Sequence, residues 1–538
     1  MRLQRLWLKQ FRNLRDVTVD FAEYYEPSTR QPANTERKPI RSHALIGQNG
    51  TGKSNMMEAL ITIFRNIDLD LPATFDYELD YQIRDNKIKI TADTVNQNRP
   101  FVWVNGEKQS QGFLLKNDYE YLPAHIFAYY SGKNDRIEAL FQTHQERYKN
   151  ILQQDKDDLV RRLFYFRGGH SQLVLLSCLL SNDTEFKKLL GNLGIESIES
   201  ANFVLKKPHA LKDLSDNDLL QGDPRFWYAR GTVVNNLLNE LWKVAWAPIQ
   251  ETCSVTIDFR RRPEKQELMY LFVPDQATLE QLGEMVGTPE RFFRYAEAAY
   301  IGDLLEEVRI TVKKRGADGC ISFKQLSEGE LQMLTVLGLM RITRQDQCLF
   351  LLDEPDTHLN PIWKLRYFDD IEKILGVDSS ENQVGESQIL ITTHDPIMVG
   401  SLRREQVHIL RKQNHKTVIE QPGEHPQGMG VTGLLKSELF GLSSTLDPET
   451  ERRLYRRNEL FAIGDSRTVS QDEELSYLSA ELADLGFSSS DFKDPVYALF
   501  AKKMAQHKRL KTPPATPAER AEQDAIADAI IDEILKES

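Results

Sequence analysis

The residues best suited to chemistry lie in a glycine-rich loop near the start of the chain. The run Gly47-Gln48-Asn49-Gly50-Thr51-Gly52-Lys53-Ser54 fits the spacing G-x-x-x-x-G-K-[ST], between an expected strand (HALIG) and an expected helix (KSNMMEALITIF). Backbone N–H groups of such a loop wrap phosphates, the lysine reaches the outer phosphates, and the serine hydroxyl holds Mg²⁺. The N-terminus of the helix adds partial positive charge. The sequence therefore predicts a phosphate site that also includes Asn55.

Acidic residues and a histidine follow two apolar stretches further along the chain. Asp353 and Glu354 end the run CLFLLDEP, and His394 ends the run SQILITTHDP. Parallel strands deliver such residues to the carboxyl edge of a sheet, where ligands bind. Asp353 suits a magnesium ligand and Glu354 a general base for an attacking water. His394 suits a hydrogen bond to a phosphate or to that water. The alternative is that the two acids only cap the next helix.

A second glycine-containing loop, QLSEGELQML at residues 325–334, opens onto an apolar helix. Ser327, the backbone of Gly329 and the helix N-terminus near Glu330 together suit an anion. One chain therefore carries two loops that suit phosphate.

The order of these four elements resembles that of the ABC-type ATPases: P-loop, L-S-x-G-E loop, strand with Asp-Glu, strand with His. The resemblance covers roughly residues 1–136 and 306–422. It implies ATP and Mg²⁺ as cofactors, and dimers or higher oligomers in which Ser327 and Gly329 complete the ATP site of a second subunit. It also implies an α/β fold, an ABC-type P-loop NTPase core, with slow hydrolysis of ATP to ADP and phosphate.

Two further stretches narrow the resemblance. LKQFRNL resembles the non-transport branch that includes RecF, SMC and Rad50 proteins, which makes Phe11, Arg12 and Asn13 candidate nucleotide contacts. DEPDTHLNP and LKSELFGLSSTLDPETERRLYRRNEL resemble the ATPases of Septu-type anti-phage defence (the PtuA family), including the retron-associated form. That family implies an HNH nuclease as partner chain and, in the retron form, a reverse transcriptase with its RNA–DNA hybrid.

The sequence departs from the family pattern in two places. The glutamine expected after the strand HIFAYY is not recognisable, which leaves Tyr130 or Ser131 in its place. Asn360 stands where many ABC-type ATPases have aspartate.

Two other functions are also compatible with the sequence. The chain could be a RecF-like DNA-repair ATPase that acts without a nuclease partner, or a nucleotide-bound scaffold without turnover. No D-x-D motif follows residue 422, and no histidine pair has HNH spacing. Nuclease activity is therefore not expected on this chain.

The motifs divide the chain into four expected regions. Residues 1–136 and 306–430 form the two parts of the ATPase core, and residues 137–305 form a mixed, mainly helical insertion. Residues 431–538 form a helical C-terminal extension and a candidate partner-docking region.

Composition limits the partners and the compartment. With a net charge of −12 over 538 residues, the chain is not expected to coat nucleic acid through bulk charge. The triplet Arg260, Arg261 and Arg262 is the first candidate for a local phosphate contact, against the alternative of a solvated face. Four scattered cysteines without a C-x-x-C pair indicate buried free thiols. The N-terminus does not resemble a signal peptide and no apolar run approaches about 18 residues, so a cytoplasmic protein without a membrane span is expected.

Overall fold

The computed structural model describes most of the chain, which divides into two compact units. The first unit holds residues 1–45, 50–394 and 410–419, and the second holds residues 46–49, 395–409 and 420–538. The described residues are 1–26, 39–116, 119–132, 135–149, 162–166, 168–208, 220–255, 264–316, 319–343, 347–374, 387–414, 416–442, 444–485 and 517–537.

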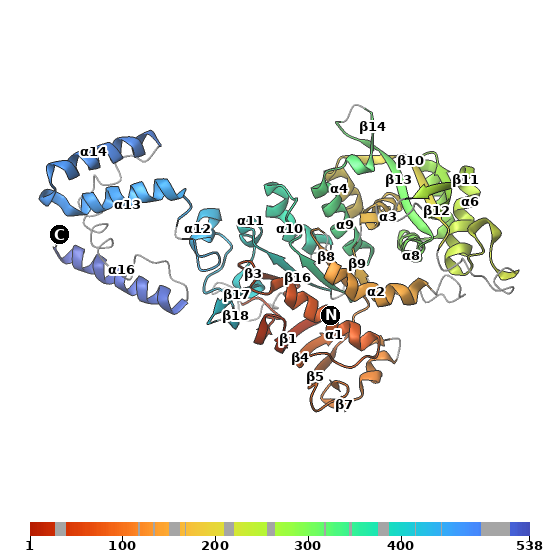
Figure 1. Ribbon diagram of the computed structural model, residues 1–538, viewed down its shortest axis with the longest axis horizontal. Helices are drawn as coiled ribbons and strands as arrows, with labels where there is room; N and C mark the ends of the chain where they lie inside the picture. The colour runs from red at the N-terminus through yellow and green to blue at the C-terminus, as the bar shows by residue number, and fades with distance from the viewer. Residues whose placement is uncertain are drawn as a thin grey trace. The chain divides into compact units, whose positions relative to one another are not determined.

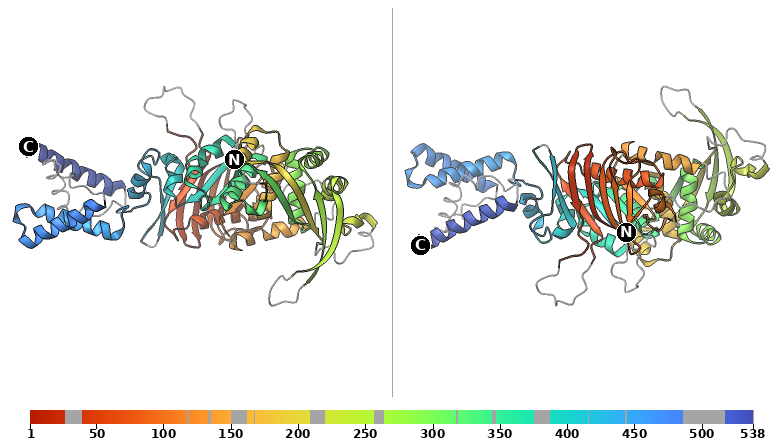
Figure 2. Two further views of the ribbon diagram at one scale, coloured as in Figure 1. Left: turned by 90° about the horizontal axis from the view of Figure 1, so that it is seen from above. Right: turned by 90° about the horizontal axis from the view of Figure 1, so that it is seen from below.

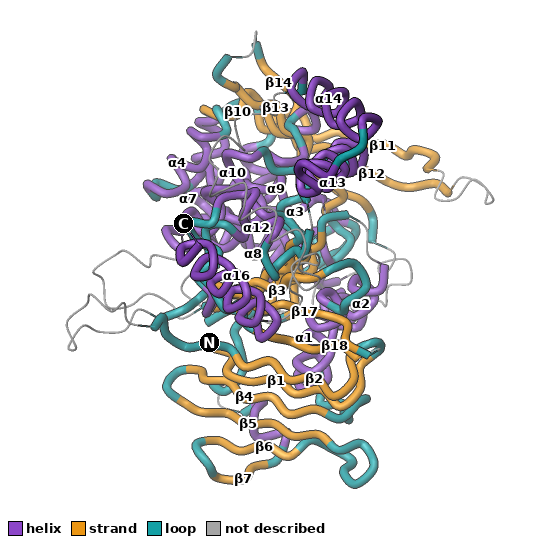
Figure 3. The backbone as a smooth tube through the Cα atoms, turned by 90° about the vertical axis from the view of Figure 1, so that its left-hand side faces the viewer, coloured by secondary structure: helices purple, strands orange, loops and turns teal. Residues whose placement is uncertain are grey.

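An antiparallel six-stranded sheet begins the chain. Its order is β2-β1-β4-β5-β6-β7, and Figure 3 shows β1, β4, β5, β6 and β7 side by side in orange. Along β4 and β5, buried residues alternate with partly covered or exposed ones, so one face of these strands packs on the core. The strands are β1 (Arg2–Phe11), β2 (Leu14–Asp20), β4 (Tyr77–Ile83), β5 (Asn86–Ala92), β6 (Phe101–Val104) and β7 (Glu107–Gln109).

A seven-stranded sheet carries the carboxyl ends expected to bear the acids and the histidine. Its order is β18-β17-β3-β16-β15-β8-β9, and β15 pairs in parallel with both β16 and β8. All residues of β15 and β16 are buried, as expected for parallel strands covered on both faces. The strands are β3 (Ser42–Gly47), β8 (Ile126–Tyr130), β9 (Leu163–Tyr165), β15 (Leu349–Asp353), β16 (Gln388–Thr393), β17 (Val407–Gln413) and β18 (Lys416–Glu420).

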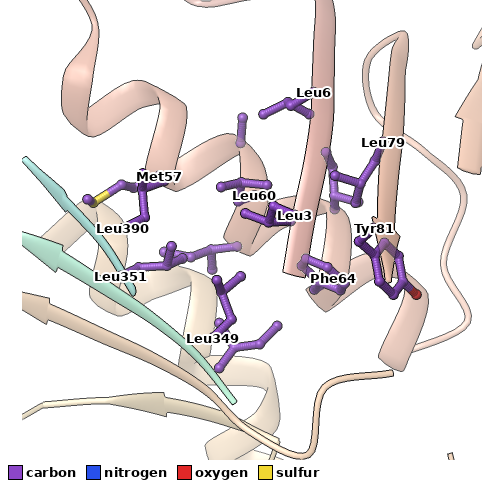
Figure 4. Packing of buried hydrophobic residues seen from close by; sticks show 14 of the residues in the cluster. Leu3, Leu6, Met57, Leu60, Phe64, Leu79, Tyr81, Leu349, Leu351 and Leu390 are labelled. Atoms are coloured by element: carbon purple, nitrogen blue, oxygen red, sulfur yellow. The ribbon is translucent and has the colours of Figure 1, made fainter. Parts of the chain in front are cut away.

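Helix α1 (Lys53–Asp68) lies between these two sheets (Figure 1). Buried residues lie on nearly all sides of this helix, and they include the polar residues Lys53, Glu58, Thr62 and Asn66 as well as apolar ones. Figure 4 shows Leu60 and Phe64 of α1 near Leu3 and Tyr81 of the antiparallel sheet, with Met57 near Leu390 of the other sheet. One continuous core therefore fixes the start of α1, and with it the P-loop, against both sheets.

A third sheet, antiparallel and five-stranded, lies largely within the region expected to be an insertion. Its order is β11-β12-β10-β13-β14, and Figure 2 shows its yellow-green strands as long, curved ribbons. Its strands are β10 (Ile195–Lys206), β11 (Trp246–Val255), β12 (Glu264–Val273), β13 (Leu305–Lys314) and β14 (Cys320–Ser322). The same region holds α2 (Asp135–Lys149), α3 (Gly168–Leu180), α4 (Thr184–Asn192), α6 (Asn239–Val244), α7 (Gln276–Val286) and α8 (Pro289–Ile301).

The remaining helices follow the second glycine loop. In the first unit these are α9 (Glu328–Ile342) and α10 (Pro361–Ile374). In the second unit they are α11 (Pro396–Val399), α12 (Gly430–Lys436), α13 (Pro448–Ile463), α14 (Val469–Asp484) and α16 (Pro517–Glu537). The α/β core and the helical C-terminal region expected from the sequence are confirmed.

Two expectations from composition have different outcomes. No helix among the described residues is long and apolar enough to cross a membrane. The expectation that all four cysteines are buried is wrong, because Cys320 is exposed and Cys253 is only partly covered. Both lie on the outer strands of the five-stranded sheet, β14 and β11, where one side of the strand has no neighbour.

Candidate functional site

The P-loop glycines adopt backbone conformations that other residues rarely adopt. Gly50 has φ +78° and Gly52 has φ +109°. A Cβ atom on Gly52 would also lie 2.5 Å from Cδ2 of Leu14. Gly52 is the N-cap of α1 and supplies no side-chain hydrogen bond to the helix. The first N–H groups of α1 are therefore not occupied by a capping side chain, which leaves them suited to an anion.

Side chains from the β1–β2 turn and from β18 hold this loop in shape. The amide of Asn13 donates to the carbonyl of Gly50 at 2.9 Å and accepts from Asn55 at 2.6 Å. The hydroxyl of Thr417 donates to the carbonyl of Thr51 at 3.0 Å. The structure thus places Asn13 and Asn55 at the P-loop, as part of its scaffold.

Asp353 lies at the end of the central strand β15 and is almost completely buried. Its carboxylate receives hydrogen bonds from the hydroxyls of Thr392 and Ser54. Burial nevertheless raises the pKa of Asp353 above its ordinary value, since a low dielectric disfavours the charged form. Its second oxygen, Oδ2, is buried without a hydrogen-bond partner. An orphaned carboxylate oxygen beside a serine hydroxyl fits a Mg²⁺ ion, which prefers such hard oxygen ligands.

Glu354 has a strained backbone that two hydrogen bonds hold in place. Its φ is +50°, a left-handed conformation that costs a non-glycine residue on the order of 1–3 kcal/mol. Its N–H lies 3.1 Å from both the carbonyl and the hydroxyl oxygen of Thr392. Its side chain reaches the residue that follows β16, with Oε1 of Glu354 3.3 Å from Nδ1 of His394. Both side chains remain partly open to solvent, so a water can reach them.

Lys53 begins α1 and faces both acids. It is 6 % exposed, and burial lowers the pKa of its ammonium group. The charges of Glu354 and Asp353 act in the opposite direction and favour the charged form. The P-loop lysine, both acids and the histidine therefore gather at one end of the parallel sheet.

The second glycine loop starts α9 with a complete capping box. The hydroxyl of Ser327 accepts from the N–H of Glu330 at 3.2 Å, and the Glu330 carboxylate accepts from the N–H of Ser327 at 2.9 Å. Lys314 of β13 forms an ion pair with the same carboxylate, and its hydrogen bond helps to lower the pKa of Glu330. Ser327 itself is exposed.

Gly329 is required by close packing within its own subunit. A Cβ atom at this position would lie 2.5 Å from the carbonyl oxygen of His358. The neighbouring Glu328 has its Oε2 atom 2.9 Å from Nδ1 of His358. The loop that follows Glu354 is therefore held against the start of α9.

The two positions that depart from the ABC-type pattern lie beside Asp353 and at the start of α10. Tyr130 ends β8 directly opposite Asp353, and burial, with Asp353 and Glu354 nearby, raises the pKa of its hydroxyl. The N–H of Ser131 donates to the carbonyl of Asp353 at 3.2 Å, and its buried hydroxyl has no hydrogen-bond partner. The amide oxygen of Asn360 accepts from the N–H of Trp363 at 2.9 Å and so caps α10, as an aspartate would.

The structure also locates Arg12, a predicted nucleotide contact. The guanidinium of Arg12 pairs with Glu58 of α1 at 2.5 Å, beside the P-loop. The triplet Arg260, Arg261 and Arg262 lies outside the described residues, so its predicted role is untested.

Sequence reasoning missed the two threonines that organise the site. Thr392 bonds both Asp353 and Glu354, and the hydroxyl of Thr393 donates to Asp356 at 2.9 Å. Both stand directly before His394 in ITTHD, so their position at the same strand end was a usable signal.

Two family models match the chain, and each covers one part of this site. Residues 1–168 match a model described as an AAA ATPase domain. Residues 274–399 match a model described as an AAA domain, putative AbiEii toxin of a type IV TA system. The first segment contains the P-loop, and the second contains the α9 loop, both acids and His394. The segments 1–168 and 274–399 are thus each similar to AAA-type ATPase domains.

Solved structures of SMC heads are also similar to this chain. The SMC head domain from Thermotoga maritima is 13 % identical, with 78 % of this chain and 99 % of that chain covered and a TM-score of 0.31. The SMC head domain with a coiled coil and joint derived from Pyrococcus yayanosii is 10 % identical, with 78 % and 97 % covered and a TM-score of 0.32. No curated protein matches the sequence.

Proposed function

We propose that the chain binds Mg·ATP and hydrolyses it slowly, with two subunits closing on each nucleotide. The observation that carries this proposal is the gathering of Lys53, Asp353, Glu354 and His394 at one sheet edge beside an uncapped helix N-terminus. Phosphoryl transfer needs mainly positioning and charge stabilisation, and these residues supply both.

Each residue has a role that its surroundings support. Lys53 and the N–H groups of the P-loop (Gly47, Gln48, Asn49, Gly50, Thr51 and Gly52) hold the phosphates, and Ser54 and Asp353 hold Mg²⁺. Glu354 accepts the proton of the attacking water, and His394 orients Glu354 and contacts the γ-phosphate. Arg12, Asn13 and Asn55 line the site, and Ser327 with Gly329 complete it from a second subunit.

The ATPase serves, on this proposal, as a switch for a partner HNH nuclease in anti-phage defence of the Septu or retron type. Support comes from the resemblance of DEPDTHLNP and of residues 435–460 to that family. The match of residues 274–399 to a toxin–antitoxin model also favours a defence context over DNA repair.

ATP turnover by the purified protein tests the enzymatic part. We expect slow Mg²⁺-dependent release of phosphate by the wild type. In Glu354→Gln, turnover should fall about 100-fold or more, because a positioned general base contributes at least that factor. The same variant should retain ATP in a dimer on size-exclusion chromatography. Equal turnover by both proteins would refute the role of Glu354.

Affinity purification of the tagged protein from its host, at native expression level, tests the partner. Mass spectrometry should identify an HNH protein, with a reverse transcriptase and an RNA–DNA hybrid if the system is of the retron type. Recovery of replication and repair proteins instead would support a RecF-like repair ATPase.

A further inference from the structure

Glu58 is an acid buried inside the core, on the helix that follows the P-loop. Its side chain is 1 % exposed, and its neighbours Met57 and Ala59 belong to the apolar cluster between the two sheets. Burying a carboxylate costs several kcal/mol of free energy unless partners compensate the charge. Burial accordingly raises the pKa of Glu58. A leucine would suit the core better, so the acid needs another explanation.

Two arginines from different elements compensate this acid. Nη2 of Arg12, in the β1–β2 turn, lies 2.5 Å from one carboxylate oxygen. Nη2 of Arg136, at the start of α2, lies 3.4 Å from the other oxygen. Both arginines stay partly exposed, with 37 % and 60 % of their side chains accessible. One negative charge is thus shared between two positive charges, and the cluster keeps a net charge of +1.

The turn that carries Arg12 is fixed at two points. Arg12 has φ +54°, a strained conformation for an arginine. The next residue, Asn13, donates to the P-loop carbonyl of Gly50 at 2.9 Å. The Arg12–Glu58 pair supplies the second anchor, on α1 itself. This ion pair therefore holds the guanidinium beside the P-loop, and a guanidinium carries five N–H donors in all.

We propose that Glu58 is a positioning residue of the nucleotide site, which fixes Arg12 beside the P-loop for contact with the phosphates of ATP. Arg136 supplies the second counter-charge, so that Arg12 retains positive charge for the phosphates. This inference rests on the proposed ATP binding and adds to it a residue with a defined role.

A double-mutant cycle on ATP affinity tests the proposal. Calorimetry would give Kd for Mg·ATP with wild type, Glu58→Gln, Arg12→Ala and the double variant. We expect Glu58→Gln to weaken binding about tenfold, and to have almost no further effect when Arg12 is already alanine. The matched control is Glu78→Gln, which removes an acid from the exposed Glu78–Lys89 pair (3.2 Å) on the antiparallel sheet and should leave Kd unchanged.

The direction in which Glu58→Gln changes ATP affinity distinguishes a positioning role of Glu58 from a purely electrostatic effect of its charge. Removing a negative charge near a phosphate site would by itself tighten ATP binding. Unchanged or tighter binding by Glu58→Gln, or additive effects in the double variant, would therefore overturn the proposal. Failure of the wild type to bind ATP would instead overturn the proposed function, and this inference with it.

A second variant covers the case in which Glu58→Gln does not fold. Arg12→Lys keeps the charge but loses the planar fork that can engage the carboxylate and a phosphate together. We expect severalfold weaker ATP binding with the thermal unfolding midpoint close to that of the wild type. Wild-type affinity in Arg12→Lys would contradict the positioning of a guanidinium by Glu58.

Discussion

Helices α1 and α9 both begin at a glycine-containing loop, yet their N-termini differ in chemistry. Helix α1 has Gly52 as its N-cap, no capping side chain and no acidic residue in its first turn. Helix α9 has Ser327 as its N-cap, a full capping box with Glu330, and Glu328 beside it. The start of α1 is thus open to an anion, whereas the start of α9 is already partly satisfied by its own side chains.

If both loops bind phosphate, as we propose, this difference gives them different tasks. The N-terminus of α1 has no capping side chain and begins with Lys53, so it suits tight binding of a nucleotide by a single subunit. The capped helix α9 carries negative charge at its start, which weakens its attraction for phosphate. Such a helix suits a contact made only when a second subunit brings a nucleotide to it.

The largest effect is expected from Lys53→Ala, which removes the cation of the open site. ATP affinity should fall by more than about 100-fold, equivalent to roughly 2.7 kcal/mol, because neither the helix N-terminus nor the loop replaces a buried charge. Calorimetric titration with Mg·ATP measures this. Lys89→Ala, on the antiparallel sheet, is the control; similar losses in both variants would contradict the assignment.

Mixing two inactive variants tests whether the α9 loop of one subunit completes the nucleotide site at the P-loop of the other subunit. Lys53→Ala removes nucleotide binding, and Ser327→Arg blocks the start of α9. If each site combines the P-loop of one subunit with the α9 loop of the other, a mixed dimer contains one intact site of two. Because about half of the dimers in a 1:1 mixture are mixed, the mixture should recover about a quarter of wild-type turnover. Each variant alone should be inactive in the same phosphate-release assay. A mixture as inactive as its components would refute a site that is shared between two subunits.

A third prediction concerns the packing that fixes the capped helix. Gly329→Ala places a Cβ atom 2.5 Å from the carbonyl of His358, and the chain must shift to accommodate it. We expect a loss of about 1–3 kcal/mol in the free energy of unfolding, as for other overpacked sites. Thermal unfolding of the protein without nucleotide measures it. Gly433→Ala is the control, because its Cβ atom would make only ordinary contacts; equal stability of both variants would contradict the close packing.

The smallest effect is expected from Glu330→Gln. The amide keeps an oxygen for the N–H of Ser327 but removes the charge next to the helix N-terminus. Since a charge at this position contributes about 0.3–1 kcal/mol, ATP-dependent dimerisation should strengthen about two- to fivefold. Sedimentation of the Glu354→Gln background with and without this change measures the shift. Weaker dimerisation would show that the Lys314–Glu330 pair matters more than the charge at the helix start.

Much of the fold and of the site followed from local sequence. The expected strand HALIG, the expected helix KSNMMEALITIF and the apolar runs before Asp353 and His394 correspond to the observed β3, α1, β15 and β16. The P-loop spacing and the two apolar strands also predicted that Lys53, Asp353 and His394 meet, because parallel strands end at one edge.

Only the tertiary structure revealed contacts between residues far apart in the chain. Thr392 holds Asp353 and Glu354 because β16 lies beside β15, and Glu58 meets Arg12 because α1 packs against the β1–β2 turn. The sequence places Thr392 at the same strand end as His394, but it does not show that Thr392 bonds Asp353 and Glu354, or that Glu58 faces Arg12. The sequence by itself therefore determined which residues could bind phosphate, since loop and strand chemistry is local. The tertiary structure decided how each is held, since burial and pairing depend on neighbours that folding alone brings together.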